Sequence, residues 1–292
     1  NDFLPPLSYI KIKDNGIDYI IQMYKEEVKK SGTYLVDLDG RINDSLLLSL
    51  FKKLSSSEDQ NMSHACEHYF SRKTPYTCLQ SYQKTFWELD NYPSINKMRH
   101  DVIDMKNKGW RTQYYNALFG KDLVVTDLCQ NYLEGLKWVV DYYVNQNPML
   151  DWSYRYSYSP TILDLMNHMQ FEMRMIDNDK ENLKLDDDRK TTSINDILDT
   201  NKLRSSILTN EAFTTMMTSG SLQLLLVLPP CSKHLIPDER KAELMTNLSL
   251  GCLHFYPRDF KISTFLKSFI WECSAILPDL DISYLYKKYQ SI

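Results

Sequence analysis

The sequence predicts a mainly helical chain with a minor β component, an α+β protein in which helices form most of the core. Two stretches, residues 17–30 and 125–143, repeat apolar side chains at the three- and four-residue spacing of an amphipathic helix. Only short segments alternate apolar and polar residues as strands do. The 292 residues are enough for one large domain or two small ones, each with its own core.

The first third of the chain predicts helices joined by short extended pieces. Residues 17–30 form the first helix, and Tyr34 to Asp39 alternate as a short strand that ends at Gly40. Asp44 is expected to cap a second helix that continues to Leu54. Residues 60–108 have weak periodicity, which indicates short helices and loops.

The strongest helical pattern covers residues 125–143 and predicts a long helix with one buried face. Residues 174–206 are rich in charge and are expected to form a surface loop or insertion. Residues 222–228 return to the core, residues 255–260 and 269–277 suggest paired extended segments, and 281–290 suggest a short helix. We therefore divide the chain into 1–173, 174–206 and 207–292.

Composition excludes several classes of protein. The net charge of −4 gives no bulk attraction to nucleic acid, and the apolar run 222–228 is too short to cross a bilayer. The spacing of the 8 glycines excludes the glycine-rich loops of dinucleotide-binding and Walker-type phosphate sites. Six scattered cysteines are typical of a reducing compartment, so we expect a cytoplasmic protein, with a nuclear one also open.

The densest group of aromatic residues lies at 152–160, directly after the long predicted helix. Rings such as Trp152 and Tyr156 can stack on unpaired bases while a guanidinium such as that of Arg155 meets phosphate, which is how proteins hold single strands without reading sequence. Composition alone favours the other interpretation, that these rings pack in the core. Trp110, Trp138 and Trp271 lie on apolar faces and are also expected in the core. A zinc site at His64, Cys66 and His68 is disfavoured because its spacing matches no common arrangement.

Six motifs in this order resemble those of the XRN-type 5′-to-3′ exoribonucleases. They are Asn1–Pro5; Gly109–Arg111 with Tyr114 and Tyr115; Glu134–Val139; Trp152–Pro160; Val227–Pro230 with Leu235–Pro237; and Phe255–Phe260, with Trp271 before Leu277 and Pro278. The resemblance covers nearly the whole chain. It implies the helical C-terminal part of a flap-nuclease-like α/β nuclease that degrades 5′-monophosphorylated single-stranded RNA with Mg²⁺ or Mn²⁺ in a two-ion site.

The resemblance also implies roles for single residues. Asp2 matches the carboxylate that is the last metal ligand of the family in chain order, and Trp152 matches an aromatic residue that stacks on the bases at the 5′ end of the substrate. The family's other acidic ligands and its 5′-phosphate pocket lie in a preceding half that we expect to be missing here. The aromatic motif departs from the family's, notably with Arg155 in place of a proline. A non-catalytic module that binds RNA or protein is therefore the alternative.

Overall fold

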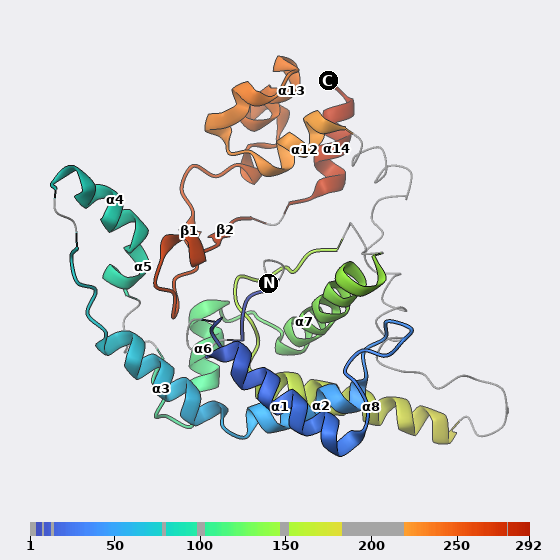
Figure 1. Cartoon of the computed structure of the whole chain (residues 1–292). Coiled ribbons are helices and arrows are strands. Elements are labelled where there is room, and N and C mark those ends of the chain that lie inside the picture. The colour runs from blue at the N-terminus through green and yellow to red at the C-terminus, as the bar shows by residue number, and fades with distance from the viewer. Residues whose placement is uncertain are drawn as a thin grey trace. The chain divides into compact units, whose positions relative to one another are not determined.

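The computed structural model describes residues 4–7, 9–12, 15–77, 80–97, 103–146, 152–182, 219–278 and 280–292. The chain divides into two compact units, Asn1–Thr200 with Ser263–Cys273, and Asn201–Ile262 with Ser274–Ile292. Both are mainly helical, which confirms the predicted fold class (Figure 1). The predicted boundaries at 173 and 206 stay a prediction. None of the described helices is long and apolar enough to span a bilayer.

The first unit contains eight α-helices among its described residues, ending in a long one. They are α1 (Gly16–Ser31), α2 (Asp44–Ser55), α3 (Glu58–Ser71), α4 (Tyr82–Asp90), α5 (Tyr92–Ile95), α6 (Trp110–Leu118), α7 (Val125–Val140), which continues into the π-helix η3 (Asp141–Asn145), and α8 (Ile162–Asn182). The 3₁₀ turn η8 (Ile270–Glu272) also belongs to this unit.

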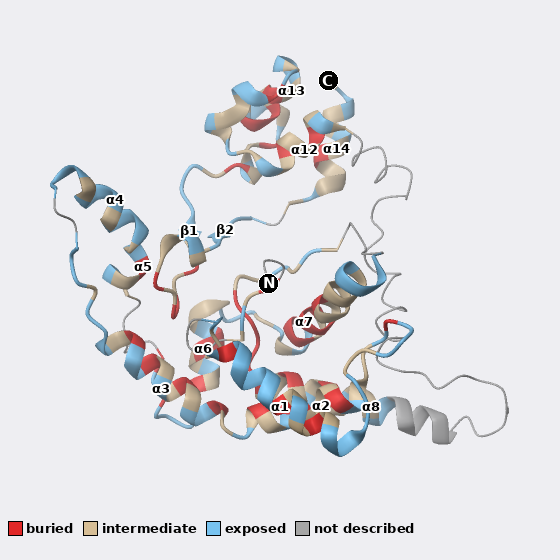
Figure 2. Cartoon of the chain, in the orientation of Figure 1, coloured by how far each residue is buried: buried red, intermediate tan, exposed pale blue. Residues whose placement is uncertain are grey.

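One core of the first unit lies among α2, α7 and α8, and α1 packs on the outside of α2 (Figures 1 and 2). Its buried side chains come from all three helices, including Phe51, Tyr132 and Leu165. A second core joins α3 and α6 to the returning segment that carries Phe265 and Leu266. By contrast, α4 contributes no buried residue and stays tan and blue in Figure 2.

The second unit is built from short elements around its own core of Leu222, Leu225, Leu244, Met245 and Leu285. Its elements are α12 (Gly220–Val227), η4 (Pro230–Leu235), α13 (Glu239–Ala242), η5 (Glu243–Met245), η6 (Leu248–Leu250), η7 (Leu253–Phe255), β1 (Lys261–Ile262), β2 (Ala275–Ile276) and α14 (Ile282–Gln290). The two strands pair antiparallel, with Lys261 opposite Ile276.

Most strongly periodic segments fold as predicted, and the deviations have local causes. The cap of α2 is Asn43, whose side chain accepts from the Leu46 N–H at 3.0 Å, and not Asp44. The predicted strand at Tyr34 to Asp39 is reduced to one bridge between Val36 and Ile42.

Two longer predictions are wrong in part. Helix α8 reaches Asn182, nine residues into the predicted charged loop, because residues 174–182 contain no glycine or proline to end it; residues 183–206 lie outside the described residues. The strand pair begins after the predicted 255–260, since Pro257 has no N–H for a ladder.

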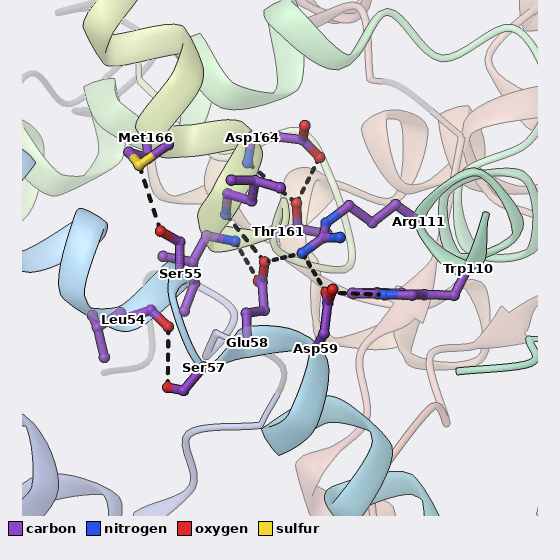
Figure 3. Close-up of polar contacts among 12 residues, drawn as sticks. Leu54, Ser55, Ser57, Glu58, Asp59, Trp110, Arg111, Thr161, Asp164 and Met166 are labelled. Atoms are coloured by element: carbon purple, nitrogen blue, oxygen red, sulfur yellow. Dashed lines mark hydrogen bonds and ion pairs between the residues drawn. The ribbon is translucent and has the colours of Figure 1, made fainter. Parts of the chain in front are cut away.

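The junction of α3, α6 and α8 depends on one buried carboxylate. Glu58, 2% exposed, begins α3. Its two oxygens accept from the backbone N–H groups of Ile162 (2.6 Å) and Leu163 (3.1 Å), at the start of α8 (Figure 3). Because the first N–H groups of a helix have no partner within it, this side chain completes the N-terminus of α8 from a distant helix.

The charge of Glu58 is balanced from α6. Arg111 donates to Glu58 at 2.8 Å and also contacts Asp59 at 2.7 Å, and the Trp110 indole donates to Asp59 at 3.1 Å (Figure 3). Burial raises the pKa of the Glu58 carboxyl, against the lowering effect of Arg111 and of the two backbone donors. The Gly109–Arg111 motif therefore has a structural role, and Trp110, 2% exposed, lies in the core as predicted.

We predict that Arg111→Met lowers the free energy of unfolding by about 3–5 kcal/mol, because it leaves Glu58 buried without a cation. A protonated Glu58 avoids this cost, and its pKa is already raised, so the deficit should shrink as the pH falls. Urea unfolding at several pH values measures both effects.

The matched control is Lys106→Met, which removes a cation from an exposed pair with Glu67. We expect it to cost less than about 1 kcal/mol. Equal losses in the two variants would contradict the role given to the Glu58 pair.

Candidate nucleic-acid interface

The aromatic segment 152–160 has no regular secondary structure, and neighbouring helices hold its C-terminal end. From α6, Tyr114 donates its hydroxyl hydrogen to the Ser159 carbonyl at 2.8 Å, and the Tyr115 hydroxyl accepts from the Thr161 N–H at 3.0 Å. Within the segment, Tyr154 donates to the Tyr158 carbonyl at 2.8 Å. Burial raises the pKa of both Tyr154 and Tyr158, so these phenols stay neutral near pH 7.

The segment at residues 4–7 lies against this loop and against α7. Tyr132 donates to the Pro5 carbonyl at 3.0 Å, and Ser159 donates to the Pro6 carbonyl at 3.1 Å. Asp2, the predicted metal ligand, lies outside the described residues. Pro6, which directly follows that motif, is therefore in contact with the aromatic motif about half of the chain away.

A single glycine permits this approach. A Cβ atom on Gly135 of α7 would lie 2.5 Å from Leu4 Cδ2 and 2.8 Å from Trp152 Cη2. Real side chains do not come that close, so only glycine fits without displacing one of the two neighbours. Three of the six motifs, those of Leu4, Gly135 and Trp152, meet at this point.

Trp152 is half-buried and belongs to a row of near-parallel rings. Its ring centroid lies 5.8 Å from that of Trp138, which in turn lies 5.4 Å from that of Tyr142, with interplanar angles of 28° and 15°. The indole N–H of Trp152 donates to Glu134 at 3.3 Å. Trp152 thus stacks on one flat neighbour, Trp138, which agrees with its predicted role as a stacking residue. That role stays a prediction, because no contact in the structure tests it.

The other two predicted RNA-binding residues differ in their surroundings. Arg155 is exposed, and its backbone N–H donates to Asn131 at 3.0 Å. Tyr156 is half-buried and packs edge-on against Phe119 and Tyr154, with centroids 6.0 Å and 5.7 Å away. Arg155 is therefore accessible to a ligand, whereas Tyr156 also helps to build the aromatic cluster.

Asn131, Glu134 and Gly135 were not predicted as site residues. No sequence signal marked Asn131, because it lies beside the apolar face of 125–143 and not on it, and only the structure shows that it is 2% exposed. A buried amide needs hydrogen-bond partners, which marks it as part of a polar network.

Candidate metal ligands do not cluster in the part of the chain that the structure describes, where no three or more His, Cys, Asp or Glu residues come together. On α3, His64 and His68 are exposed while Cys66 is 2% exposed. Burial raises the pKa of the Cys66 thiol to about 12, so it stays protonated. The thiol of Cys66 thus lies in the core, whereas the two histidines are exposed.

The predicted core position of Trp271 is wrong, because this side chain is 75% exposed. It stacks on Phe269, with ring centroids 5.8 Å apart. The apolar residues around it in the sequence belong to a short 3₁₀ turn, where periodicity carries little information.

The chain matches the family model described as "Xrn1 helical domain" over residues 1–85, 64–180 and 199–292. This chain belongs to the Xrn1 helical domain family. A 5′-3′ exoribonuclease 2 homolog of Drosophila melanogaster is 23% identical over 98% of this chain, and 5′-3′ exoribonuclease 2 of Gallus gallus is 22% identical over 96%. The same-named protein of Debaryomyces hansenii is 29% identical over 62%.

This Xrn1 helical domain spans about a third of the length of the fly and chicken relatives, 32% and 33%. It spans 15% of the Debaryomyces protein. The predicted relationship to XRN-type exoribonucleases is confirmed at the level of the family. The family match covers all three of the motifs that meet at Gly135, since it includes residues 1–85 and 64–180.

We predict that Gly135→Ala lowers the stability of the domain although alanine favours a helix by about 1 kcal/mol over glycine. The overlap with Leu4 and Trp152 costs about 1–3 kcal/mol and displaces the indole. Thermal unfolding and tryptophan emission measure the two effects.

Gly220→Ala serves as the control, because a Cβ on this helical glycine meets nothing within 4 Å. It should be no less stable than the natural chain. If Gly135→Ala behaves in the same way, the close approach of the three motifs is not the constraint described above.

Proposed function

We propose that this chain is the RNA-contacting helical part of a 5′-to-3′ exoribonuclease that acts on single-stranded RNA carrying a 5′-monophosphate. The observation that carries the proposal is the meeting of the N-terminal motif, the Gly135 motif and Trp152 at one point of the fold. Relatives named 5′-3′ exoribonuclease 2 support the reaction class.

In this proposal, three side chains of the aromatic loop have separate roles. Trp152 offers an indole face on which the base at the 5′ end stacks, backed by Trp138. Arg155, which is exposed, provides a guanidinium for backbone phosphate. Tyr156 lines the same loop and supports it through Phe119. Together they would hold an unpaired strand without reading its sequence.

The hydrolytic step needs a metal site that the described residues do not form by themselves. We propose that Asp2 is one carboxylate ligand of an Mg²⁺ or Mn²⁺ site and that a further part of the nuclease supplies the other ligands. Such ions activate water and stabilise the leaving oxygen in phosphodiester hydrolysis, and they prefer carboxylate oxygens. Binding of RNA by the aromatic loop is separate from this step.

We predict that Trp152→Ala weakens the binding of a short 5′-monophosphorylated RNA by about 1–3 kcal/mol, the usual contribution of one stacked base. Fluorescence anisotropy of the labelled RNA measures the loss. Trp152→Phe, which keeps a flat ring, should bind the RNA with an affinity between those of the natural chain and of Trp152→Ala. The binding should be the same in Mg²⁺ and in EDTA, since residues 152–160 contain no Asp, Glu, His or Cys to hold a metal ion.

Trp271→Ala is the matched control, because this tryptophan is exposed and lies on another segment. It should leave the affinity unchanged. Equal affinities for the natural chain and Trp152→Ala would return Trp152 to a purely structural role and remove the basis of the proposal.

A further inference from the structure

The carboxylate of Glu134 on α7 lies at the centre of a polar network that reaches the aromatic loop. Its Oε2 accepts from the Trp152 indole N–H at 3.3 Å and from the Asn131 amide at 3.2 Å. Its Oε1 accepts from the Gln130 amide at 3.3 Å. Both oxygens are therefore bound by neutral donors, and one of these donors is the ring to which the proposed function assigns base stacking.

The network is oriented from a second helix. The Nε2 atom of His168 on α8 lies 3.1 Å from the side-chain oxygen Oε1 of Gln130. This contact turns the side-chain nitrogen Nε2 of Gln130 toward Glu134. Burial lowers the pKa of His168, against Glu172 and Asp127, which raise it. A neutral imidazole that donates from Nε2 satisfies this arrangement, so α8 fixes the direction of the bonds that end at Trp152.

Asn131 ties the loop at a second point. Its side chain is buried, and both ends are used, since the amide nitrogen donates to Glu134 and the oxygen accepts from the Arg155 N–H at 3.0 Å. Residues 131 and 134, three apart on one helix face, thus hold residues 152 and 155, three apart in the loop. This match fixes the register of the loop on α7.

We infer that Glu134 is a positioning residue for RNA binding, which sets the plane of the Trp152 ring before a base arrives. The inference rests on the proposed function of Trp152. An indole has one N–H, so a bond from it to a fixed carboxylate restricts rotation of the ring about its side-chain torsions. A ring that is already ordered loses less conformational freedom on binding, which improves affinity without a new contact to the ligand.

The sign of the effect separates positioning from simple electrostatics. Glu134 is an acid close to a proposed polyanion site, so loss of its charge alone should tighten RNA binding. If the carboxylate acts through Trp152, Glu134→Leu instead weakens binding, by about two- to tenfold, the equivalent of ordering one side chain. Glu134→Gln also removes the charge but keeps an acceptor oxygen, so it should stay closer to the natural chain.

The experiment measures the affinity of the full chain for two 5′-monophosphorylated RNAs that differ only in whether the terminal nucleotide carries a base. Glu134→Leu should weaken binding of the complete RNA and leave the RNA with an abasic end nearly unchanged, and adding it to Trp152→Ala should have no further effect. Asp122→Asn, which removes an exposed charge three residues before α7, is the control and should not weaken either complex.

A readout without RNA accompanies the binding data. The indole ¹⁵N–¹H resonance of Trp152, assigned by its loss in Trp152→Ala, should move in Glu134→Leu and stay near its place in Glu134→Gln. The resonances of Trp87 and Trp271 should not move.

The outcomes separate the two proposals. If Trp152→Ala weakens RNA binding but Glu134→Leu does not, or if the Trp152 resonance is unmoved, the positioning role is wrong and the proposed function stands. Equal weakening of both RNAs by Glu134→Leu would likewise overturn the positioning role. If Trp152→Ala has no effect on binding, the proposed function fails and the inference fails with it.

Discussion

The fold of the first unit depends on a carboxylate that is almost fully buried. Glu58 is expensive to bury as an ion, and it is kept because three elements need it at once: α3 begins with it, Arg111 of α6 neutralises it, and α8 begins on its oxygens. Since α8 follows the aromatic loop directly, this junction also fixes where the loop ends. The C-terminal end of the loop that carries Trp152 is therefore held by a polar junction of the scaffold, whereas Trp152 itself is held by Gly135, Leu4 and Glu134.

The motifs that carry the family resemblance divide into two kinds when they are seen in the structure. Gly109–Arg111 builds the scaffold, because Trp110 and Arg111 bind the acids at the start of α3. The Glu134–Val139 motif works at the surface of that scaffold, where Gly135 admits Leu4 and Trp152 and Glu134 receives the indole N–H. The contacts of a family motif therefore decide whether it builds the scaffold or contributes to the proposed site.

Periodicity predicted the elements that bury one face. Residues 17–30, 125–143 and 281–290 fold as α1, α7 with its π-helical end, and α14, because apolar spacing reports directly on packing. High charge density misled the prediction at 174–182, where α8 continues because no glycine or proline ends it. The exposure of Trp271 is not set by a local pattern. The same holds for the site: Trp152, Arg155 and Tyr156 stand out by composition, whereas the bonds from Asn131 and Glu134 join residues about twenty apart and exist only in the folded chain.

The central claim is that RNA meets this chain at the aromatic loop beside Gly135. Photo-crosslinking tests it most directly, with a 5′-monophosphorylated RNA that carries 4-thiouridine at its first position and mass spectrometry to locate the adduct. The account predicts adducts concentrated in residues 152–160. Adducts confined to the second unit, or spread evenly over the surface, would contradict it.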